Sequence, residues 1–210
     1  MGKHGECCEL LPHMQIERNM RPLPCFGNSL FSNSPPTTGS EDEMGYGYDM
    51  ACSKCGRHHA VMLGCGFSLP TVYSELVSDI ETGAFGKEWQ ELAAQTECFA
   101  IDVETHLFRC ETCGFWECAP SLSIYTPKDV EKTLETQYGE KTVREWGRIP
   151  YVTAKELESD YVLVGEFTHV CEHCGHDMRM FSNRRTHRAT LMCPDCGGKL
   201  ERCEGVLLWD

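Results

Sequence analysis

The sequence predicts an α+β fold made of two small antiparallel β units, the first with a helical insertion, joined by a helical segment. Three observations lead to this expectation. Four Cys-x-x-Cys-Gly motifs recur along the 210-residue chain, beginning at Cys52, Cys110, Cys171 and Cys193. Stretches rich in Val, Leu, Phe and Tyr lead into or away from these motifs, as β-strands do. Between the first two motifs, and again after the second, apolar residues recur at helical spacing.

The regularity of the motifs indicates metal binding rather than a disulfide framework. The chain has 15 cysteines, and each motif pair is followed by glycine. Two thiolates separated by two residues face one ion when the backbone turns tightly, and glycine allows the positive φ that such a turn requires. A tetrahedral set of four thiolates suits zinc or iron, and zinc is favoured. We therefore expect two zinc ions per chain.

Distance along the chain assigns the eight ligands to two sites. The last two motifs are neighbours, so one expected site consists of Cys171, Cys174, Cys193 and Cys196. The other then consists of Cys52, Cys55, Cys110 and Cys113, with Cys65, Cys98, Cys118, His58 and His59 as alternative ligands. Under the simpler assignment, Cys203 and the three spare cysteines are small apolar core residues. A closed four-ligand site has no open position for substrate, so its expected role is structural.

These patterns divide the chain into four parts. Residues 1–43 are interrupted by prolines and rich in polar residues, so they are expected to form a disordered extension. Residues 44–126 hold the first unit with its two-helix insertion, and residues 127–159 form a helical connector. Residues 160–210 hold the second unit.

Four helices are expected within these parts. After Pro70, one apolar face is formed by Val72, Tyr73, Leu76, Val77 and Ile80, and a second helix covers about 87–95. In the connector, Thr126 is expected as an N-cap and Pro127 at the first helical position, with the helix ending near Gly139. A short helix is expected around 154–159.

Cys193-Pro194-Asp195-Cys196-Gly197 and the three other motifs resemble the knuckles of rubredoxin-like zinc ribbons. Over residues 48–210 the chain is also similar to a group of bacterial proteins with paired zinc ribbons and no established activity. The shared features are Gly64-Cys65-Gly66-Phe67 before Pro70-Thr71-Val72-Tyr73, then Tyr125-Thr126-Pro127 and Leu208-Trp209-Asp210. The resemblance implies zinc-ribbon units and bound metal, and it implies no particular reaction.

Composition favours a protein-binding role in the cytoplasm. The formal net charge is −13, which opposes general nucleic-acid binding because nonspecific affinity comes from basic residues on phosphates. The sequence has no phosphate loop, nucleophile elbow or His-Glu-x-x-His motif, so a binding module is favoured over an enzyme. There is no secretory signal and no run of 18 apolar residues, so no membrane partner is expected. Abundant free thiols suggest a reducing compartment.

One local feature is basic. The second unit carries Arg179, Arg184, Arg185 and Arg188, and its expected turn would direct some of them outward. Guanidinium groups pair with phosphate or carboxylate, so this tip is a candidate contact for an anion or a partner. Two alternative functions follow: nucleic-acid contact through the tip, and rubredoxin-like electron transfer with iron.

Overall fold

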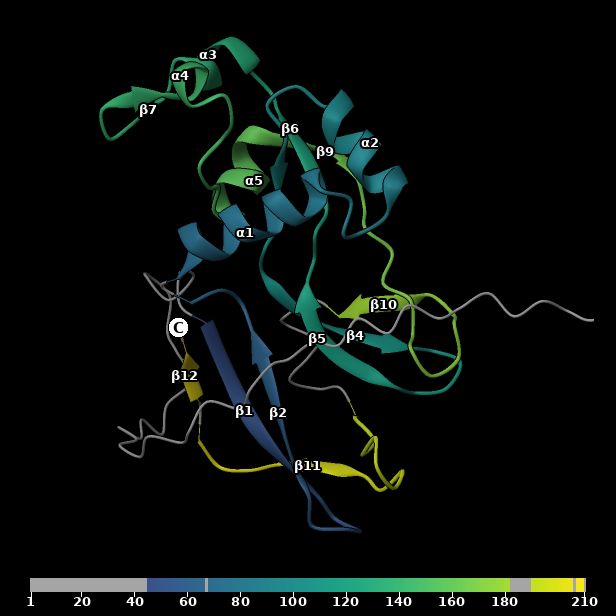
Figure 1. The fold of residues 1–210 in the computed structure, drawn as a ribbon. Helices are drawn as coiled ribbons and strands as arrows, with labels where there is room; N and C mark the ends of the chain where they lie inside the picture. The colour runs from purple at the N-terminus through teal and green to yellow at the C-terminus, as the bar shows by residue number, and fades with distance from the viewer. Residues whose placement is uncertain (1–44, 67, 182–189, 206, 210) are drawn as a thin grey trace, which may run out of the picture. The chain divides into compact units, whose positions relative to one another are not determined.

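The computed structural model of the protein describes residues 45–66, 68–181, 190–205 and 207–209. The extension expected at residues 1–43 lies outside them. In the described part, small antiparallel sheets occur together with short helices, which agrees with the expected α+β class in its coarse form (Figure 1). None of the helices described is long and apolar enough to cross a membrane.

The first sheet is centred on β1 (Gly45–Cys52). β2 (His58–Leu63) pairs antiparallel along one edge of β1. Two strands from the end of the chain share the other edge: β12 (Leu207–Trp209) pairs with residues 45–47, and β11 (Leu200–Arg202) pairs with residues 50–52. The two ends of the described chain therefore meet in one sheet.

A second sheet repeats this plan. β4 (Thr105–Cys110) and β5 (Trp116–Pro120) form a hairpin, and the later β10 (Met178–Phe181) pairs with β4. The register repeats as well, because Cys110 is opposite Met178 as Cys52 is opposite Leu200. Each of these sheets therefore combines a hairpin with a strand that follows a later cysteine motif.

A helical layer packs on a third sheet, which contains β3 (Ala100–Ile101), β6 (Ile124–Pro127) and β9 (Tyr161–Gly165). Around it lie α1 (Leu69–Glu81), α2 (Lys87–Gln95) and α5 (Ala154–Asp160) (Figure 1). The expected apolar face of α1 enters the core through Tyr73, Val77 and Ile80. The helices predicted near 70–83, 87–95 and 154–159 are thus confirmed.

The connector begins later than the sequence predicted. It consists of α3 (Val130–Leu134), β7 (Gln137–Tyr138), β8 (Lys141–Thr142) and α4 (Val143–Trp146). The prediction of Thr126 as N-cap is wrong, because Thr126 and Pro127 belong to β6 and pair with β9. Asp129 caps α3 instead, accepting a hydrogen bond from the backbone N–H of Lys132 at 3.0 Å. Because Pro127 pairs with β9 as part of β6, helix α3 begins three residues after this proline, at Val130.

Candidate metal centres

The eight motif cysteines lie in two groups of four, but the pairing of motifs differs from the one predicted. The outer site, as we call it, joins the first motif to the last: Cys52, Cys55, Cys193 and Cys196. The inner site joins the second to the third: Cys110, Cys113, Cys171 and Cys174. The expected sets, first with second and third with fourth, are therefore corrected. The cause is strand pairing, since β11 carries the last motif to β1 and β10 carries the third to β4.

All four motifs form the same turn. In the first, the backbone N–H of Gly56 donates to the carbonyl of Cys52 at 2.9 Å, and the N–H of Cys52 donates to the carbonyl of Arg57 at 2.8 Å. Equivalent bonds occur in the other three motifs. The motif glycines have φ of 71°, 77°, 71° and 67°, so the predicted need for glycine after the second cysteine is confirmed.

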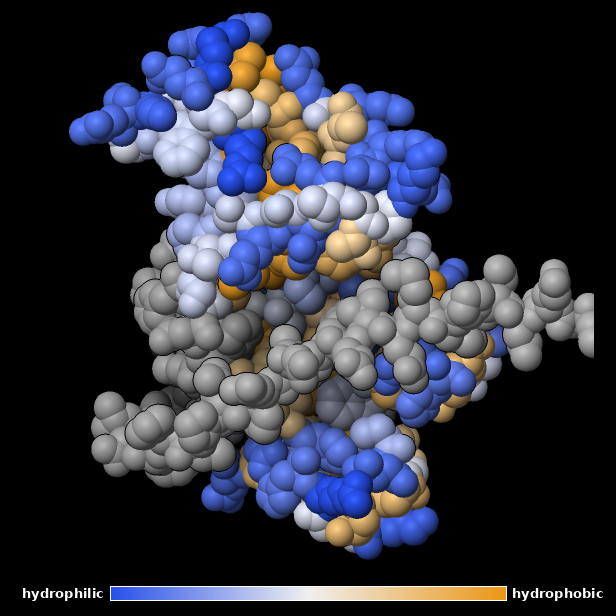
Figure 2. All heavy atoms as spheres, in the orientation of Figure 1, coloured by the Kyte–Doolittle hydropathy of each residue, from blue (hydrophilic) through white to orange (hydrophobic). Residues whose placement is uncertain are grey.

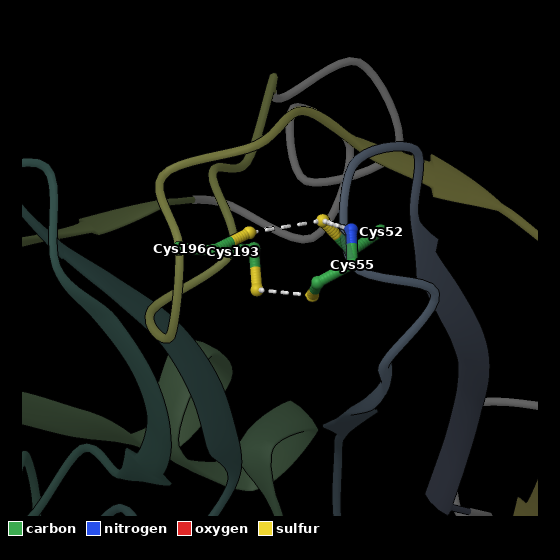
Figure 3. A group of neighbouring side chains, drawn as sticks. All are labelled: Cys52, Cys55, Cys193 and Cys196. Atoms are coloured by element: carbon green, nitrogen blue, oxygen red, sulfur yellow. Dashed lines mark hydrogen bonds between the residues drawn. The ribbon is translucent and has the colours of Figure 1, made fainter.

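The sulfur atoms fit a tetrahedral ion. In the outer site the Sγ atoms of Cys52 and Cys196 are 3.5 Å apart, and those of Cys55 and Cys193 are 3.8 Å apart (Figure 3). In the inner site the corresponding distances are 3.4 Å and 3.5 Å. Metal–sulfur bonds of about 2.3 Å in a regular tetrahedron place sulfurs about 3.8 Å apart. Both groups are therefore close to the size that one ion needs.

The acidity of the thiols also fits a cation. The backbone N–H of Cys55 lies 3.5 Å from the Cys52 sulfur and is the main cause that lowers the pKa of Cys52 to about 6. At Cys196 the N–H of Gly198 acts in the same direction. Burial and the three neighbouring thiols outweigh it and raise the pKa of Cys196 to about 12. Four crowded thiols cannot all ionise without a compensating charge, and a divalent ion supplies that charge.

Gly198 allows the two motifs of the outer site to approach closely. A Cβ at this position would lie 2.6 Å from Cβ of Lys54 and 2.8 Å from Sγ of Cys52. At the equivalent position of the inner site the chain has His176, so the turn itself accepts a side chain. Gly198 is therefore required because the first motif lies so close to it. The sequence alone could not reveal this requirement without the correct pairing of the motifs.

Aromatic and charged residues surround the sites. His59 was predicted as an alternative ligand, and its Nε2 lies 3.3 Å from Sγ of Cys193 and 3.5 Å from Oδ2 of Asp195. Trp116 donates from Nε1 to the carbonyl of Met192 at 2.9 Å and so fastens the segment before the last motif. Neither the His59 contact nor the Trp116 bond has a signature in the sequence, because both depend on the pairing of distant motifs.

The remaining cysteines differ from one another. Cys65, Cys98 and Cys118 are half-buried and belong to none of the possible ligand groups found among the described residues. Cys98 and Cys118 pack at the margins of two hydrophobic core clusters, which agrees with their predicted role as small apolar packing residues. Cys203 departs from its predicted packing role, because it lies with Asp49 and His58 in a third group.

The predicted basic tip is described only in part. Arg179 lies on β10, and its Nη1 is 3.2 Å from Oε1 of Glu111 in the turn of the second motif. The other three members, Arg184, Arg185 and Arg188, lie outside the described residues. Contact of the tip with nucleic acid or an acidic partner thus stays a prediction.

Two complete groups of four cysteines, each closed by paired hairpins, are compatible with structural metal binding. Comparisons with protein-family models, curated proteins and solved structures gave no match. The likeness to zinc ribbons therefore rests on the cysteine motifs and their turns.

Proposed function

We propose that this chain is a zinc-binding protein whose two metal sites are structural and whose body serves as a protein-interaction module. The observation that carries the structural role is the completeness of each group, since four thiolates fill a tetrahedral shell and leave no position for substrate. Each site also joins segments that are distant in sequence. The ions accordingly stabilise sheets that are too small to be stable alone.

The identity of the metal is tested by elemental analysis together with absorption. A colourless protein with two zinc ions per chain is the expected result. Iron in the same thiolate shell would colour the protein red and would support the alternative of electron transfer. Zinc is favoured because a closed shell of four cysteines is the usual structural zinc site.

We propose β9 as the interaction surface. Three consecutive residues of this strand are exposed hydrophobic side chains: Val162 at 50%, Leu163 at 50% and Val164 at 41%. Successive side chains of a strand point to opposite faces, so both faces of β9 are accessible here. Within the described part of the chain β9 pairs only with β6, which leaves its other edge without a strand. On the face in Figure 2, hydrophobic residues reach the surface in the part that holds β6, β9 and the helices.

An extended apolar segment of another protein fits this edge. Open backbone donors and acceptors on an edge strand bind an added strand, and the flanking side chains supply apolar contact. Natural edge strands are commonly protected by charged residues, and residues 162–164 of β9 contain none. The combination of an open edge with three apolar side chains favours a protein over a nucleic acid as partner.

A matched pair of variants tests this surface. Leu163→Glu places a charge on the β9 edge, and Trp146→Glu places one at an equally exposed apolar position on α4, where Trp146 is 49% exposed. Affinity capture from the native host, with metal analysis of each sample, should show a partner lost only from Leu163→Glu and zinc unchanged in both. Equal capture by the two variants would remove β9 from the proposal. If the wild-type protein runs as a dimer in size-exclusion chromatography and Leu163→Glu runs as a monomer, the partner at β9 is a second copy of the same chain.

A further inference from the structure

A third group of metal-binding side chains lies on the first sheet, away from its cysteine-rich core face. Tyr48, Met50 and Cys52 of β1 are buried in the core, so the alternate residue Asp49 points to the other face. His58 on β2 is opposite Ala51 and therefore shares this outer face with Asp49. On the other edge, the backbone N–H of Cys203 donates to the carbonyl of Asp49 at 2.9 Å, which places Cys203 beside it.

The three side chains converge. Nδ1 of His58 contacts Oδ2 of Asp49, and the Cys203 sulfur lies near the Asp49 carboxylate. One ligand atom from each residue lies within 4.8 Å of the other two. The arrangement comes from three different strands or strand ends, so sheet pairing holds it together rather than one flexible loop.

The donor set is that of an open zinc-type site. Imidazole nitrogen, carboxylate oxygen and thiolate sulfur are the three donor types that zinc accepts, and zinc sites with an open position use three protein ligands. A divalent ion balances one carboxylate and one thiolate, whereas each four-thiolate site keeps a net negative charge. The His58 side chain is 61% exposed, so solvent reaches the group directly.

We propose that Asp49, His58 and Cys203 form a third metal site, which binds an exchangeable divalent ion of the zinc class and leaves one coordination position open. The site differs from the outer and inner sites in exposure, in donor set and in its open position. Burial and the nearby Asp49 raise the pKa of the Cys203 thiol, so an ion that binds there displaces the thiol proton to solvent. Without an ion, the His58 ring and the Asp49 carboxylate are in hydrogen-bond contact, and the Cys203 thiol lies beside them.

Cobalt titration of the full chain, after its four-thiolate sites have been filled with zinc, tests the site. Added Co²⁺ should bind one further equivalent and give a thiolate-to-cobalt absorption band. Cys203→Ala should abolish the band, and His58→Ala or Asp49→Ala should weaken binding by more than about 100-fold, since loss of even an outer-shell partner costs 10–100-fold. Cys118→Ala is the matched control, because Cys118 belongs to no ligand group among the described residues, and it should leave the third ion in place.

Two outcomes would overturn the proposal. One is that no third equivalent binds to the wild-type protein at millimolar Co²⁺. The other is that Cys203→Ala binds it unchanged, which would show that the ion sits elsewhere on the surface. Failure of this proposal can be told apart from failure of the proposed structural sites. If only the third site is wrong, Cys203→Ala still retains two zinc ions per chain, whereas failure of the structural sites would leave fewer than two.

Discussion

Paired cysteine substitutions distinguish two ways of pairing the motifs. In the nested arrangement the first motif pairs with the last and the second with the third, and in the sequential arrangement neighbouring motifs pair. In the structure, Cys52→Ala/Cys193→Ala removes two ligands from the outer site and leaves the inner site complete. Cys52→Ala/Cys110→Ala removes one ligand from each site and leaves neither complete. If neighbouring motifs were paired instead, these two results would be exchanged.

The expected magnitudes follow from the ligand count. The first variant should keep one chelator-resistant ion per chain and the second none, against two in the wild type. A structural zinc site contributes on the order of 10 kcal/mol of folding free energy, so loss of the ion should dominate any packing effect of the small Cys→Ala change. Within the outer site, the second substitution should add little to the first, because the two ligands act on one ion.

The assay is metal analysis after competition with a chelator. Amide hydrogen exchange then shows which of the two sites has lost its structure. In Cys52→Ala/Cys193→Ala, the N–H of residue 52, bonded to the Arg57 carbonyl, should lose protection. The N–H of Cys110, bonded to Phe115, should keep it. One resistant ion in Cys52→Ala/Cys110→Ala and none in Cys52→Ala/Cys193→Ala would refute the nested pairing.

Two further predictions concern local structure. Gly198→Ala should loosen the outer site and speed zinc loss to a chelator, because its Cβ would meet the Cys52 sulfur. Gly198 lacks the positive φ of Gly56 (71°), so the expected effect comes from the contact and not from backbone strain, and a rate of zinc loss unchanged by Gly198→Ala would contradict this reasoning. Hydrogen bonds from the Thr142 N–H and hydroxyl hold the pKa of Glu145 below its ordinary value. The capping box therefore stabilises the fold fully at pH values above the ordinary pKa of Glu, and this stabilisation is lost as the pH falls through the lowered pKa. The stability difference between wild type and Glu145→Gln in chemical denaturation should therefore shrink below about pH 4.3, and a difference that grew in acid would contradict it.

Local chemistry was readable from the sequence, whereas the pairing of distant segments was not. The Cys-x-x-Cys-Gly turn is specified by its own residues, and Gly56 and its equivalents adopt the positive φ that the motif requires. The apolar spacing of Tyr73, Val77 and Ile80 fixed the buried face of α1 in the same way. Such features depend on contacts within one turn or one helix, so a single sequence contains them.

The choice of partner motif depends instead on strand pairing across the chain. Four equivalent motifs offer three ways to make two sites, and proximity favoured the wrong one. The spacing after the motifs could not decide the pairing either, because Met178 and Leu200 follow their motifs at the same distance and occupy the same register opposite Cys110 and Cys52. Thr126 failed as a helix cap for a related reason, since its pairing with β9 overrode the local preference.

Nested pairing also sets an order of events during synthesis. The inner site joins cysteines 58 to 64 residues apart, whereas the outer site joins cysteines 138 to 144 residues apart. At 5–20 residues per second, Cys52 and Cys55 wait on the order of 10 s for their partners to emerge from the ribosome. Closing the longer loop costs only about 0.7 kcal/mol more than closing the shorter one, so timing separates the two sites more than energy does. The hairpin of β1 and β2 is thus made first and receives its metal partners last, and until then its thiols are open to oxidation or to a wrong metal.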